Sequence, residues 1–258
     1  MNKEVEKIYK KKIKEFQKHN KLYYDKSAPA ISDGEFDELK ADIINLEKKY
    51  SFLRSSKSPS DSVGFKPSKN FEKFKHKVRM LSLSNAFDRE DLINFEKKIL
   101  NYLNEKISLE YSVEPKIDGI SASLTYKNGS FVRGLSRGDG KEGEDITDNL
   151  NTIKDIPKQI LARDFPKEID IRGEVFIQNS DFKYLKDKFA NPRNAASGSL
   201  RQKNPEDTKK IPLKFIAYTF GFEKGLKVEN QSDYLKQLKV WGFKTNPLNK
   251  LIIGVKKL

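Results

Sequence analysis

The first fifty residues repeat apolar side chains at the spacing of two helices. Apolar residues recur every three or four positions, first at Val5, Ile8, Tyr9, Ile13 and Phe16 and then at Phe36, Leu39, Ile43 and Leu46. This period predicts two amphipathic helices. The stretch KSAPAIS at 26–32 contains a proline and separates them. Asp33 stands directly before the second apolar series, so we predict it as the N-cap of that helix.

Beyond about residue 70 the period shortens to that of strands. Short alternating runs predict strands at 109–115, 121–127, 130–137, 168–177 and 213–222, and helical spacing returns at 88–104, 180–190 and 232–240. Asn128-Gly129 separates two of the runs by two residues, which is a strong signal of a hairpin turn. Strands in this order predict an α+β fold with mainly antiparallel pairing.

A change of composition between these regions marks a domain boundary. Residues 51–70 are rich in Ser, Pro, Gly and Lys, and this composition is typical of a linker. We therefore expect two domains, a small helical one with its linker at 1–68 and a larger sheet-containing one at 69–258. A chain of 258 residues is long enough for both to bury a core.

Composition excludes several classes of protein. The chain is 36% hydrophobic with 17 Phe and 10 Tyr, as expected of a globular protein. No run of about 18 apolar residues predicts a membrane span, and the charged N-terminus lacks the apolar segment of a signal peptide. The absence of Cys rules out thiolate zinc sites, and the two histidines, His19 and His76, lie far apart. A cytoplasmic protein without a protein-built metal centre is the simplest expectation.

The net charge of +14 adds a question about partners. A lysine-rich proteome would give such a value without any functional meaning. A polyanionic partner, most often a nucleic acid, would give it as well. The charge alone does not decide between them, because it does not show where the basic side chains gather.

The stretch EPKIDG at 114–119 places charges where the chain otherwise alternates as a half-buried strand. On a strand, Glu114, Lys116 and Asp118 would share one face. Pro115 places the segment at an edge or a strand end, and Gly119 permits a turn or a close approach. An exposed salt-bridging face would explain the pattern equally well. Arg172 and Glu174 repeat it on a later strand, however, and two charged faces side by side would form a polar pocket.

A lysine beside carboxylates in such a pocket is a candidate nucleophile. The amine must lose its proton before it attacks, and neighbouring carboxylates alone oppose that loss. A divalent metal that neutralises Asp118 and Glu174 would reverse the balance. The constellation therefore makes most chemical sense with Mg²⁺ (or Mn²⁺) and a phosphate-bearing substrate.

Further motifs in the sequence relate these residues to a known protein family. EPKIDG resembles the K-x-D-G motif of the covalent nucleotidyltransferases, the DNA ligases, RNA ligases and capping enzymes. The chain is similar to the bacterial NAD-dependent DNA ligases in LYYDKSAPAISDGEFDELK, MLSLSNAFD, SRGDGKEGEDITDN, IRGEVFI and FANPRNAASGSLRQ, which occur in that order. The resemblance covers residues 5–245 and implies a mainly antiparallel nucleotidyltransferase domain of the ATP-grasp-like ligase type.

The resemblance also implies a reaction. Lys116 would attack the α-phosphorus of NAD⁺ and release nicotinamide mononucleotide (NMN), and the AMP would then pass to the 5′-phosphate of nicked double-stranded DNA in replication and repair. It implies a monomer that works in the cytoplasm at the nucleoid.

Residue roles follow from the same resemblance. Lys116, Asp118, Arg137 and Glu174 would be catalytic, and Ser82, Leu83, Glu114 and Gly119 would join Lys116, Arg137 and Glu174 around the nucleotide. Arg193, Asn194 and Arg201 would contact DNA, and the small residues at 195–198 would let the backbone approach a phosphate. Each motif has a structural alternative: a turn at 137–140, a helix start at Asn191-Pro192, and an ion pair between Glu174 and Arg172.

The helical region resembles the NMN-binding domain of the same family. The matching residues are Tyr23, Tyr24, Asp33, Gly34, Glu35, Phe36 and Asp37. Carboxylates suit a cationic nicotinamide ring and aromatic rings suit stacking on it. Phe36 departs from the family, where Tyr is common. Because ATP-dependent ligases lack this domain, it favours NAD⁺ as the donor.

The family pattern continues beyond this chain. Two more lysine motifs, an OB-fold, a zinc finger, helix-hairpin-helix repeats and usually a BRCT domain follow, and LIIGVKKL at 251–258 does not have the spacing of the next motif. We therefore expect a C-terminally truncated adenylation region with little or no nick sealing. A non-catalytic remnant that binds NAD⁺ or DNA is the alternative.

Overall fold

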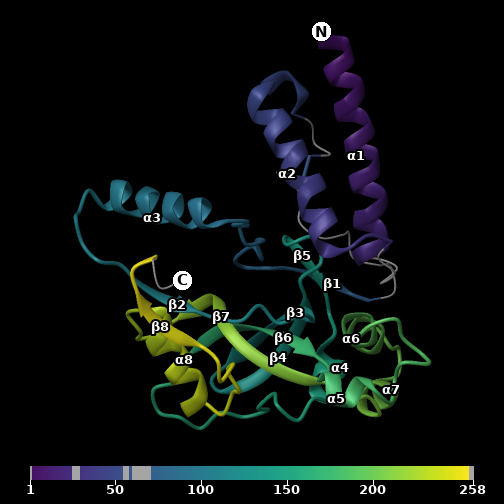
Figure 1. The fold of residues 1–258 in the computed structure, drawn as a ribbon. Helices are drawn as coiled ribbons and strands as arrows, with labels where there is room; N and C mark the ends of the chain where they lie inside the picture. Colours follow the sequence, from purple (N-terminus) through teal and green to yellow (C-terminus); the bar gives the residue numbers. More distant parts are fainter. Residues whose placement is uncertain (1, 25–29, 55–57, 60–70, 256–258) are drawn as a thin grey trace.

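The computed structural model of the chain describes residues 2–24, 30–54, 58–59 and 71–255. Two long helices, α1 (Asn2–Tyr24) and α2 (Asp33–Lys49), pack against each other and stand above the rest of the molecule (Figure 1). Their apolar faces meet in a small separate core of Tyr9, Ile13, Phe16, Phe36, Ile43 and Leu53. The predicted helical pair is thus confirmed.

The N-cap of α2 is Ser32, and the prediction of Asp33 as the cap was wrong by one position. The Ser32 hydroxyl accepts a hydrogen bond from the Glu35 backbone N–H at 3.3 Å. The Glu35 carboxylate in turn accepts from the Ser32 backbone N–H at 2.7 Å, which completes a capping box. The pair of residues satisfies two N–H groups at once, an advantage that a lone aspartate lacks.

The predicted linker at 51–70 begins inside the helical unit. Ser51–Leu53 form a 3₁₀ turn, η1, and Leu53 is buried in the α1–α2 core. The buried Ser58 hydroxyl donates a hydrogen bond to the Glu47 carboxylate of α2 at 2.8 Å. Residues 55–57 and 60–70 lie outside the described residues. The start of the stretch therefore packs against the helices although its composition is that of a linker.

The larger unit is built on a four-stranded antiparallel sheet. Its strands are β3 (Ile120–Lys127), β4 (Ser130–Ser136), β6 (Glu168–Phe176) and β7 (Lys214–Lys224), in the order β4-β3-β6-β7. Asn128 and Gly129 turn the chain between β3 and β4 with φ of 47° and 79°, the left-handed values of a type I′ turn. The expected α+β class with antiparallel pairing and the expected hairpin are both confirmed.

The two faces of this sheet differ in chemistry. On one face Leu124, Tyr126 and Ile171 enter the main core together with side chains of α8 (Gln231–Val240) and α4 (Thr147–Asn151). On the other face polar residues of β3 stand opposite charged residues of β6, in the pairs Ser121–Glu174, Ser123–Arg172 and Thr125–Asp170. Strand alternation thus assigns packing to one face and leaves the other for polar chemistry.

Two small sheets flank this one. β1 (Lys73–Lys75) pairs with β5 (Glu142–Glu144), and β2 (Glu110–Val113) pairs with β8 (Lys250–Ile253) beside the helix α3 (Arg89–Leu103). Figure 1 shows α3, β2 and β8 on the opposite side of the sheet from α6 (Pro192–Leu200). β1, β5 and β8 were not predicted, because three or four residues are too few to show a period.

The predicted strand around EPKIDG was wrong in its C-terminal half. β2 ends at Val113, and residues 114–118 form an irregular loop, so Glu114, Lys116 and Asp118 do not share a strand face. Pro115 has no N–H for a ladder, which favours the end of the strand there. A Cβ at Gly119 would lie 2.3 Å from the Val175 carbonyl oxygen. The glycine therefore allows the loop to enter β3 against β6.

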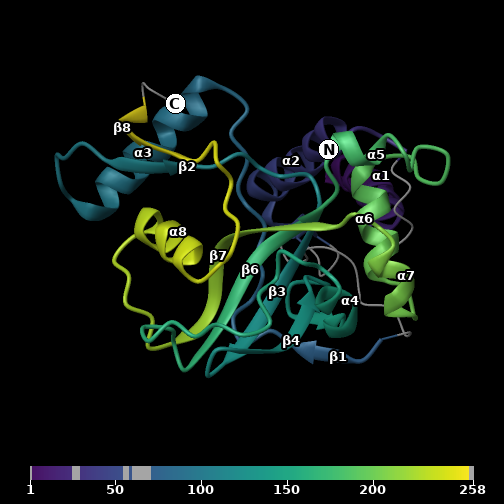
Figure 2. The same cartoon turned by 90° about the horizontal axis from the view of Figure 1, so that it is seen from below.

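Short helices cover the edge of the sheet away from α8 (Figure 2). The helix predicted at 180–190 is shorter, since α5 spans only Asn179–Phe182 and turns follow it. In α6 the small residues Ala195 and Ala196 are fully buried near Phe182 and Phe189. Their small size lets α6 pack closely, and the expectation that residues 195–198 let the backbone approach a phosphate stays a prediction.

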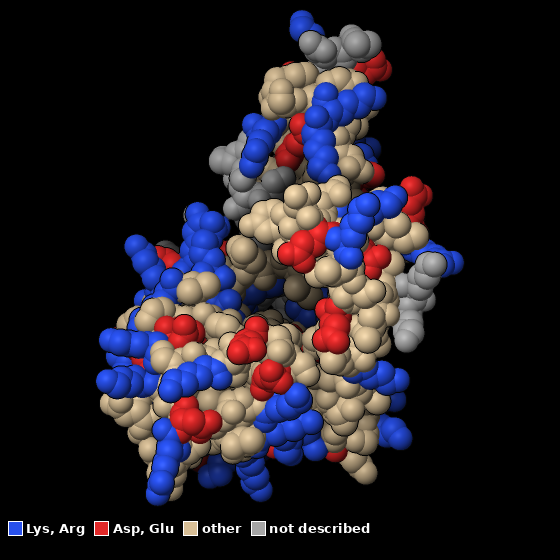
Figure 3. Space-filling model, turned by 90° about the vertical axis from the view of Figure 1, so that its left-hand side faces the viewer, with Lys and Arg blue, Asp and Glu red and all other residues tan. Residues whose placement is uncertain are grey.

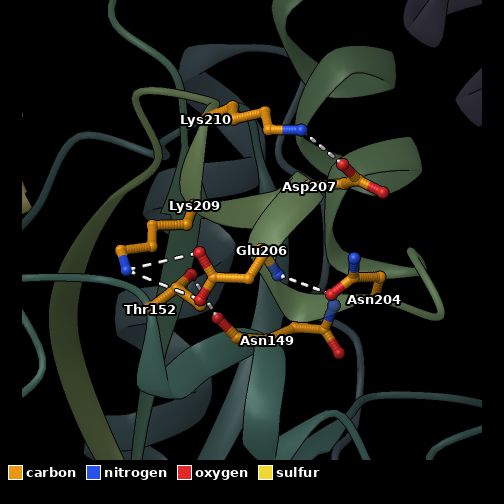
Figure 4. A network of polar contacts seen from close by, with 7 residues as sticks. All are labelled: Asn149, Thr152, Asn204, Glu206, Asp207, Lys209 and Lys210. Atoms are coloured by element: carbon orange, nitrogen blue, oxygen red, sulfur yellow. Dashed lines mark hydrogen bonds and ion pairs between the residues drawn. The ribbon is translucent and has the colours of Figure 1, made fainter.

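Polar contacts hold α7 (Pro205–Lys209) against α4, and Figure 4 shows this region with the polar contacts made within each helix. The buried Asn149 amide of α4 donates to the Thr208 hydroxyl at 2.7 Å and to the Gln202 carbonyl at 2.9 Å. Asn204 caps α7 by accepting from the Glu206 N–H at 3.1 Å. These hydrogen bonds hold the segment that follows α6 against α4.

Candidate active site

Lys116 lies exposed on the loop between β2 and β3, at the mouth of the polar sheet face. Two residues further on, the Asp118 carboxylate accepts a hydrogen bond from the Arg193 guanidinium of α6 at 3.1 Å. Arg193 is the second residue of a helix whose N-cap, Asn191, accepts from the Asn194 N–H at 2.7 Å. The capped start of α6 thus places an arginine beside the candidate nucleophile.

Glu174 stands at the buried centre of this face. Its carboxylate is only 8% exposed and accepts a hydrogen bond from the Ser121 hydroxyl at 2.9 Å. Burial raises the pKa of Glu174 to about 7, against the opposing effects of Ser121 and of the charges on Arg193, Arg137 and Lys116. Electrostatic contact with all three cations shows that residues from four separate segments converge on one carboxylate. Glu174 is bonded to Ser121 here and not to Arg172.

Arg137 comes from the turn that follows β4. Its carbonyl accepts from the Gly140 N–H at 3.0 Å and lies 3.2 Å from Nε2 of His76. Gly138 and Gly140 have φ of 57° and 83°, so the SRGDG motif does form a turn. That turn presents Arg137 to Glu174, and the structural and functional interpretations of the motif are therefore compatible.

Glu114 is held by a residue that sequence analysis did not select. Gln231, at the start of α8, donates from its amide to the Glu114 carboxylate at 2.8 Å and to the Tyr218 carbonyl at 2.6 Å. The Ser112 hydroxyl adds a bond to Glu114 at 3.2 Å. Gln231 lies 117 positions away and carries no motif, so no signal in one sequence identifies it.

A pocket of about 470 Å³ adjoins Asp118. Its walls are Ile117, Asp118, Phe176, Ile177, Gln178, Asn179, Ser180 and Pro192. Of these only Asp118 was a predicted site residue. Residues 176–180 of this wall connect the end of β6 to α5. Strand and helix patterns do not describe such a connection, so they did not reveal the pocket.

Other predicted site residues lie apart from this cluster. Ser82 and Leu83 are exposed on the irregular segment before α3, Leu83 with 77% of its surface in solvent. Asn194 is buried, and Arg201 forms an ion pair at 3.1 Å with the fully buried Glu144 of β5. Arg201 therefore has a structural partner in addition to any ligand.

The predicted NMN-binding residues of the helical pair are divided between core and surface. Phe36 is 8% exposed and stacks on Phe16 with ring centroids 5.1 Å apart, so its ring belongs to the core. The Glu35 carboxylate serves the capping box, whose hydrogen bonds with Ser32 lower the pKa of Glu35. Gly34 is exposed and Asp37 is partly exposed. The side chains of Tyr23, Tyr24 and Asp33 lie outside the described part of the structure.

Within the helical pair, the basic charge lies on α1, whereas α2 carries more acidic than basic residues. α1 carries eight lysines and three glutamates, a net +5 of the chain's +14 in 23 residues. Figure 3 shows basic side chains over this upper lobe and a hollow below it, with basic atoms in the depth of the hollow. Among the described residues no group of three or more His, Cys, Asp or Glu could hold a metal ion. No described helix is long and apolar enough to span a membrane.

A lysine at the mouth of an antiparallel sheet, with a buried carboxylate and two arginines around it, is the arrangement expected of the class of nucleotidyl-transferring enzymes. Two family models match the chain: the NAD-dependent DNA ligase adenylation domain over residues 68–258 and the DNA ligase-like N-terminal NAD⁺-binding domain over residues 2–64. The chain therefore belongs to the NAD-dependent DNA ligase family.

Curated relatives agree with this assignment. The DNA ligase of Pelagibacter ubique is 68% identical over 259 residues, which cover all of this chain and 38% of the relative. The DNA ligase of Parvibaculum lavamentivorans is 47% identical over 91% of the chain and 34% of the relative. That of Bradyrhizobium sp. ORS 278 is 44% identical over 97% and 36%. The chain thus spans a little more than a third of the length of these relatives.

Proposed function

We propose that the chain carries out the adenylation step of an NAD-dependent DNA ligase, with Lys116 as the nucleophile. The observation that carries this proposal is the convergence of Lys116, Arg137 and Arg193 on the buried Glu174. Neutral Lys116 Nζ attacks the α-phosphorus of NAD⁺, a P–N bond forms, and the P–O bond to nicotinamide mononucleotide breaks. The proton of the amine passes to solvent, and AMP remains on the lysine.

The surrounding charges suit this transfer. Arg137 and Arg193 supply the positive charge that stabilises the phosphoryl group as it moves. Asp118 orients Arg193 through their 3.1 Å ion pair, and Glu114, fixed by Gln231, meets the adenine. Glu174 binds the ribose, and Gly119 keeps Lys116 close to it. Ser82 and Leu83 cover the nucleotide from the segment before α3.

A divalent cation completes the site in this proposal. Mg²⁺ in nucleotide sites is commonly held by one or two carboxylates together with phosphate oxygens. Asp118 and Glu174 offer that number of carboxylates, and burial raises the pKa of Glu174 to about 7, so a further cation would stabilise its ionised form. The two side chains therefore fit a phosphate-bound Mg²⁺, which would neutralise charge during transfer.

The helical pair supplies the specificity for NAD⁺. We assign residues 1–68 to an NMN-binding domain and 69–258 to a nucleotidyltransferase domain of the ATP-grasp-like type, supported by family matches that divide the chain at nearly the same place. Tyr23, Tyr24, Asp33, Gly34, Glu35 and Asp37 would receive the nicotinamide half. Phe36 contributes from the core, by setting the position of α2 against Phe16.

The acceptor of the AMP is nicked double-stranded DNA, and the protein acts on it as a monomer at the chromosome. Arg193, Asn194 and Arg201 lie on or next to α6, on one side of the lysine. Arg193 is the partly exposed contact, whereas Asn194 and Arg201 hold the helix and β5 in place behind it. The lysines of α1 add a positive surface suited to a polyanion.

Incubation with NAD⁺ labelled in its adenylate half tests the proposal. With Mg²⁺, the label is expected on the chain after denaturing electrophoresis, and Lys116→Ala is expected to abolish it. Lys154→Ala, at an exposed lysine of the same domain, is the matched control and should label like the wild type. Absence of label on the wild type would favour a non-catalytic NAD- or DNA-binding protein, and label that survives in Lys116→Ala would refute the nucleophile.

A further inference from the structure

Arg172 is a buried cation on the polar sheet face that the proposed chemistry does not use. It lies between Asp170 and Glu174 on β6 and is 9% exposed. Its Nη2 donates to the Val78 carbonyl and its Nη1 to the Arg79 carbonyl at 3.3 Å. Its Nε is buried without a hydrogen-bond partner among the described residues. Both observed bonds thus go to one backbone segment more than ninety positions away.

That segment is attached on its other side to the turn that carries Arg137. The His76 N–H donates to the Lys141 carbonyl at 2.8 Å, and the Met80 N–H donates to the Gly140 carbonyl at 2.9 Å. Met80 is also buried. From 81 to 87 the chain is exposed and irregular until α3 begins. The bonds of Arg172 and Met80 are therefore the last described attachments before Ser82 and Leu83.

The neighbouring strand leaves room for the guanidinium. A Cβ on Gly221 of β7 would lie 2.6 Å from Nη2 of Arg172 and 2.8 Å from its Cζ and Nε. Real Cβ atoms do not approach so closely, so any side chain at 221 would push the guanidinium away from the segment. The absence of a side chain at Gly221 therefore leaves the space in which the Arg172 guanidinium makes these two hydrogen bonds.

Packing alone does not account for an arginine here. Burial of a cation is costly unless its donors are satisfied, and an apolar side chain of similar volume would cost less. The two acids that flank it on the same face already accept from hydroxyls, Asp170 from Thr125 at 2.7 Å and Glu174 from Ser121 at 2.9 Å. An arginine at this position can donate two hydrogen bonds at once, to the backbone carbonyls of residues 78 and 79. A planar guanidinium is better suited to such paired bonds than any other side chain.

We propose that Arg172 is a positioning residue that fixes the segment 78–83 against the sheet, so that Ser82 and Leu83 border the bound nucleotide. The inference rests on the proposed adenylation of Lys116. Arg172 does not touch the nucleotide in this account and acts through the backbone of Val78 and Arg79. Its loss should therefore weaken nucleotide binding more than it slows the chemical step.

Hydrogen exchange and adenylation kinetics test the assignment together. Arg172→Met removes the donors, whereas Gly221→Ala keeps the arginine and removes its room. We expect both to raise amide exchange at 78–83 about tenfold and to raise about tenfold the NAD⁺ concentration that gives half-maximal adenylation rate, because a hydrogen bond from a charged donor contributes at least a factor of ten. The maximal single-turnover rate of adenylation should change less than about threefold. Arg172→Lys should restore part of the NAD⁺ affinity, and the exposed Arg163→Met is the control.

The outcomes separate this proposal from the one on which it rests. A folded Arg172→Met or Gly221→Ala protein with wild-type exchange at 78–83 would overturn the positioning role. So would a fall in the maximal single-turnover rate of adenylation at unchanged NAD⁺ affinity, because Arg172 would then act on the chemistry itself. A wild-type chain that takes no label from NAD⁺ would instead refute the adenylation proposal, while the exchange data would still show whether Arg172 holds the segment.

Discussion

The helical pair and the unit built on the four-stranded sheet differ in how many charged side chains they bury. α1 and α2 keep most of their charges in solvent, and their core is made of aliphatic and aromatic side chains. The sheet unit buries Glu144, Asp170, Arg172 and Glu174. Both units are built from regular elements with a normal apolar core on one side. The difference lies in the second face of the sheet, which is closed over by loops and by α6.

This difference in charge burial indicates which unit contains the reactive groups. Burial of an ionised group is unfavourable unless other groups compensate it, so a fold selected for stability alone would avoid it. The helical pair follows that rule, with Glu47 hydrogen-bonded by Tyr9 and Ser58 as its buried acid. The sheet unit buries four charged residues, and one of them, Glu174, interacts electrostatically with Lys116. Measurements of stability should therefore separate the two units.

The largest effect is expected at the pair formed by Arg201 and Glu144. Arg201→Met removes the cation and leaves the carboxylate of Glu144, which is fully buried, without its 3.1 Å partner. Loss of one partner of a buried ion pair costs about 4 kcal/mol. Urea unfolding followed by the fluorescence of Trp241 would measure it. A loss below 1 kcal/mol would mean that this buried charge behaves like a surface charge, and the contrast between the units would fail.

A somewhat smaller effect, dependent on pH, is expected at Glu174. Its pKa is about 7 in the folded chain against an ordinary value of 4.5, so the folded state holds a proton that the unfolded state releases. Stability should fall as pH rises from about 4.5 to about 7, by about 3 kcal/mol in total, and this contribution should be constant above and below that window.

Glu174→Gln isolates this contribution because glutamine mimics the protonated acid. Relative to the wild type, the variant should gain about 3 kcal/mol in unfolding free energy between pH 4.5 and pH 8. Glu206→Gln, at an exposed glutamate of α7, serves as the control and should show no such gain. An equal difference at both pH values would show that Glu174 has the same pKa in the folded and unfolded chain, as a surface acid would.

The two units also differ in how much of them could be predicted from the sequence. Period and turn signals were sufficient for α1, α2 and the four long strands, because each spans at least seven residues with a clear pattern. β1, β5 and β8 depend on partners 70 to 140 positions away, and no local pattern records such pairing. α6 lacks an apolar period because small residues let it pack on several sides.

For the candidate site, the residue types were predictable and their geometry was not. The motif residues around Lys116 were selected from the sequence, but a strand was predicted where the chain forms a loop, since alternation of charges resembles a strand face. The contacts of Gln231 and Arg172 were not predicted, because their hydrogen-bond partners are far away in the sequence. What a single sequence lacks is the set of long-range contacts that holds a site together.

The smallest effect is expected at an ion pair of the helical unit. Lys12 of α1 reaches Asp42 of α2 at 2.7 Å, the same kind of contact as the one between Arg201 and Glu144, but both side chains remain partly in solvent, 31% and 58% exposed. Lys12→Met should cost less than about 1 kcal/mol, because water screens the attraction and hydrates the aspartate that is left. Lys7→Met, at an exposed lysine of the same helix, is the control. Added salt should reduce even this small cost, because it screens exposed charges. If Lys12→Met cost as much as Arg201→Met, burial would not be what distinguishes the two ion pairs, and the contrast between helical pair and sheet would need another cause.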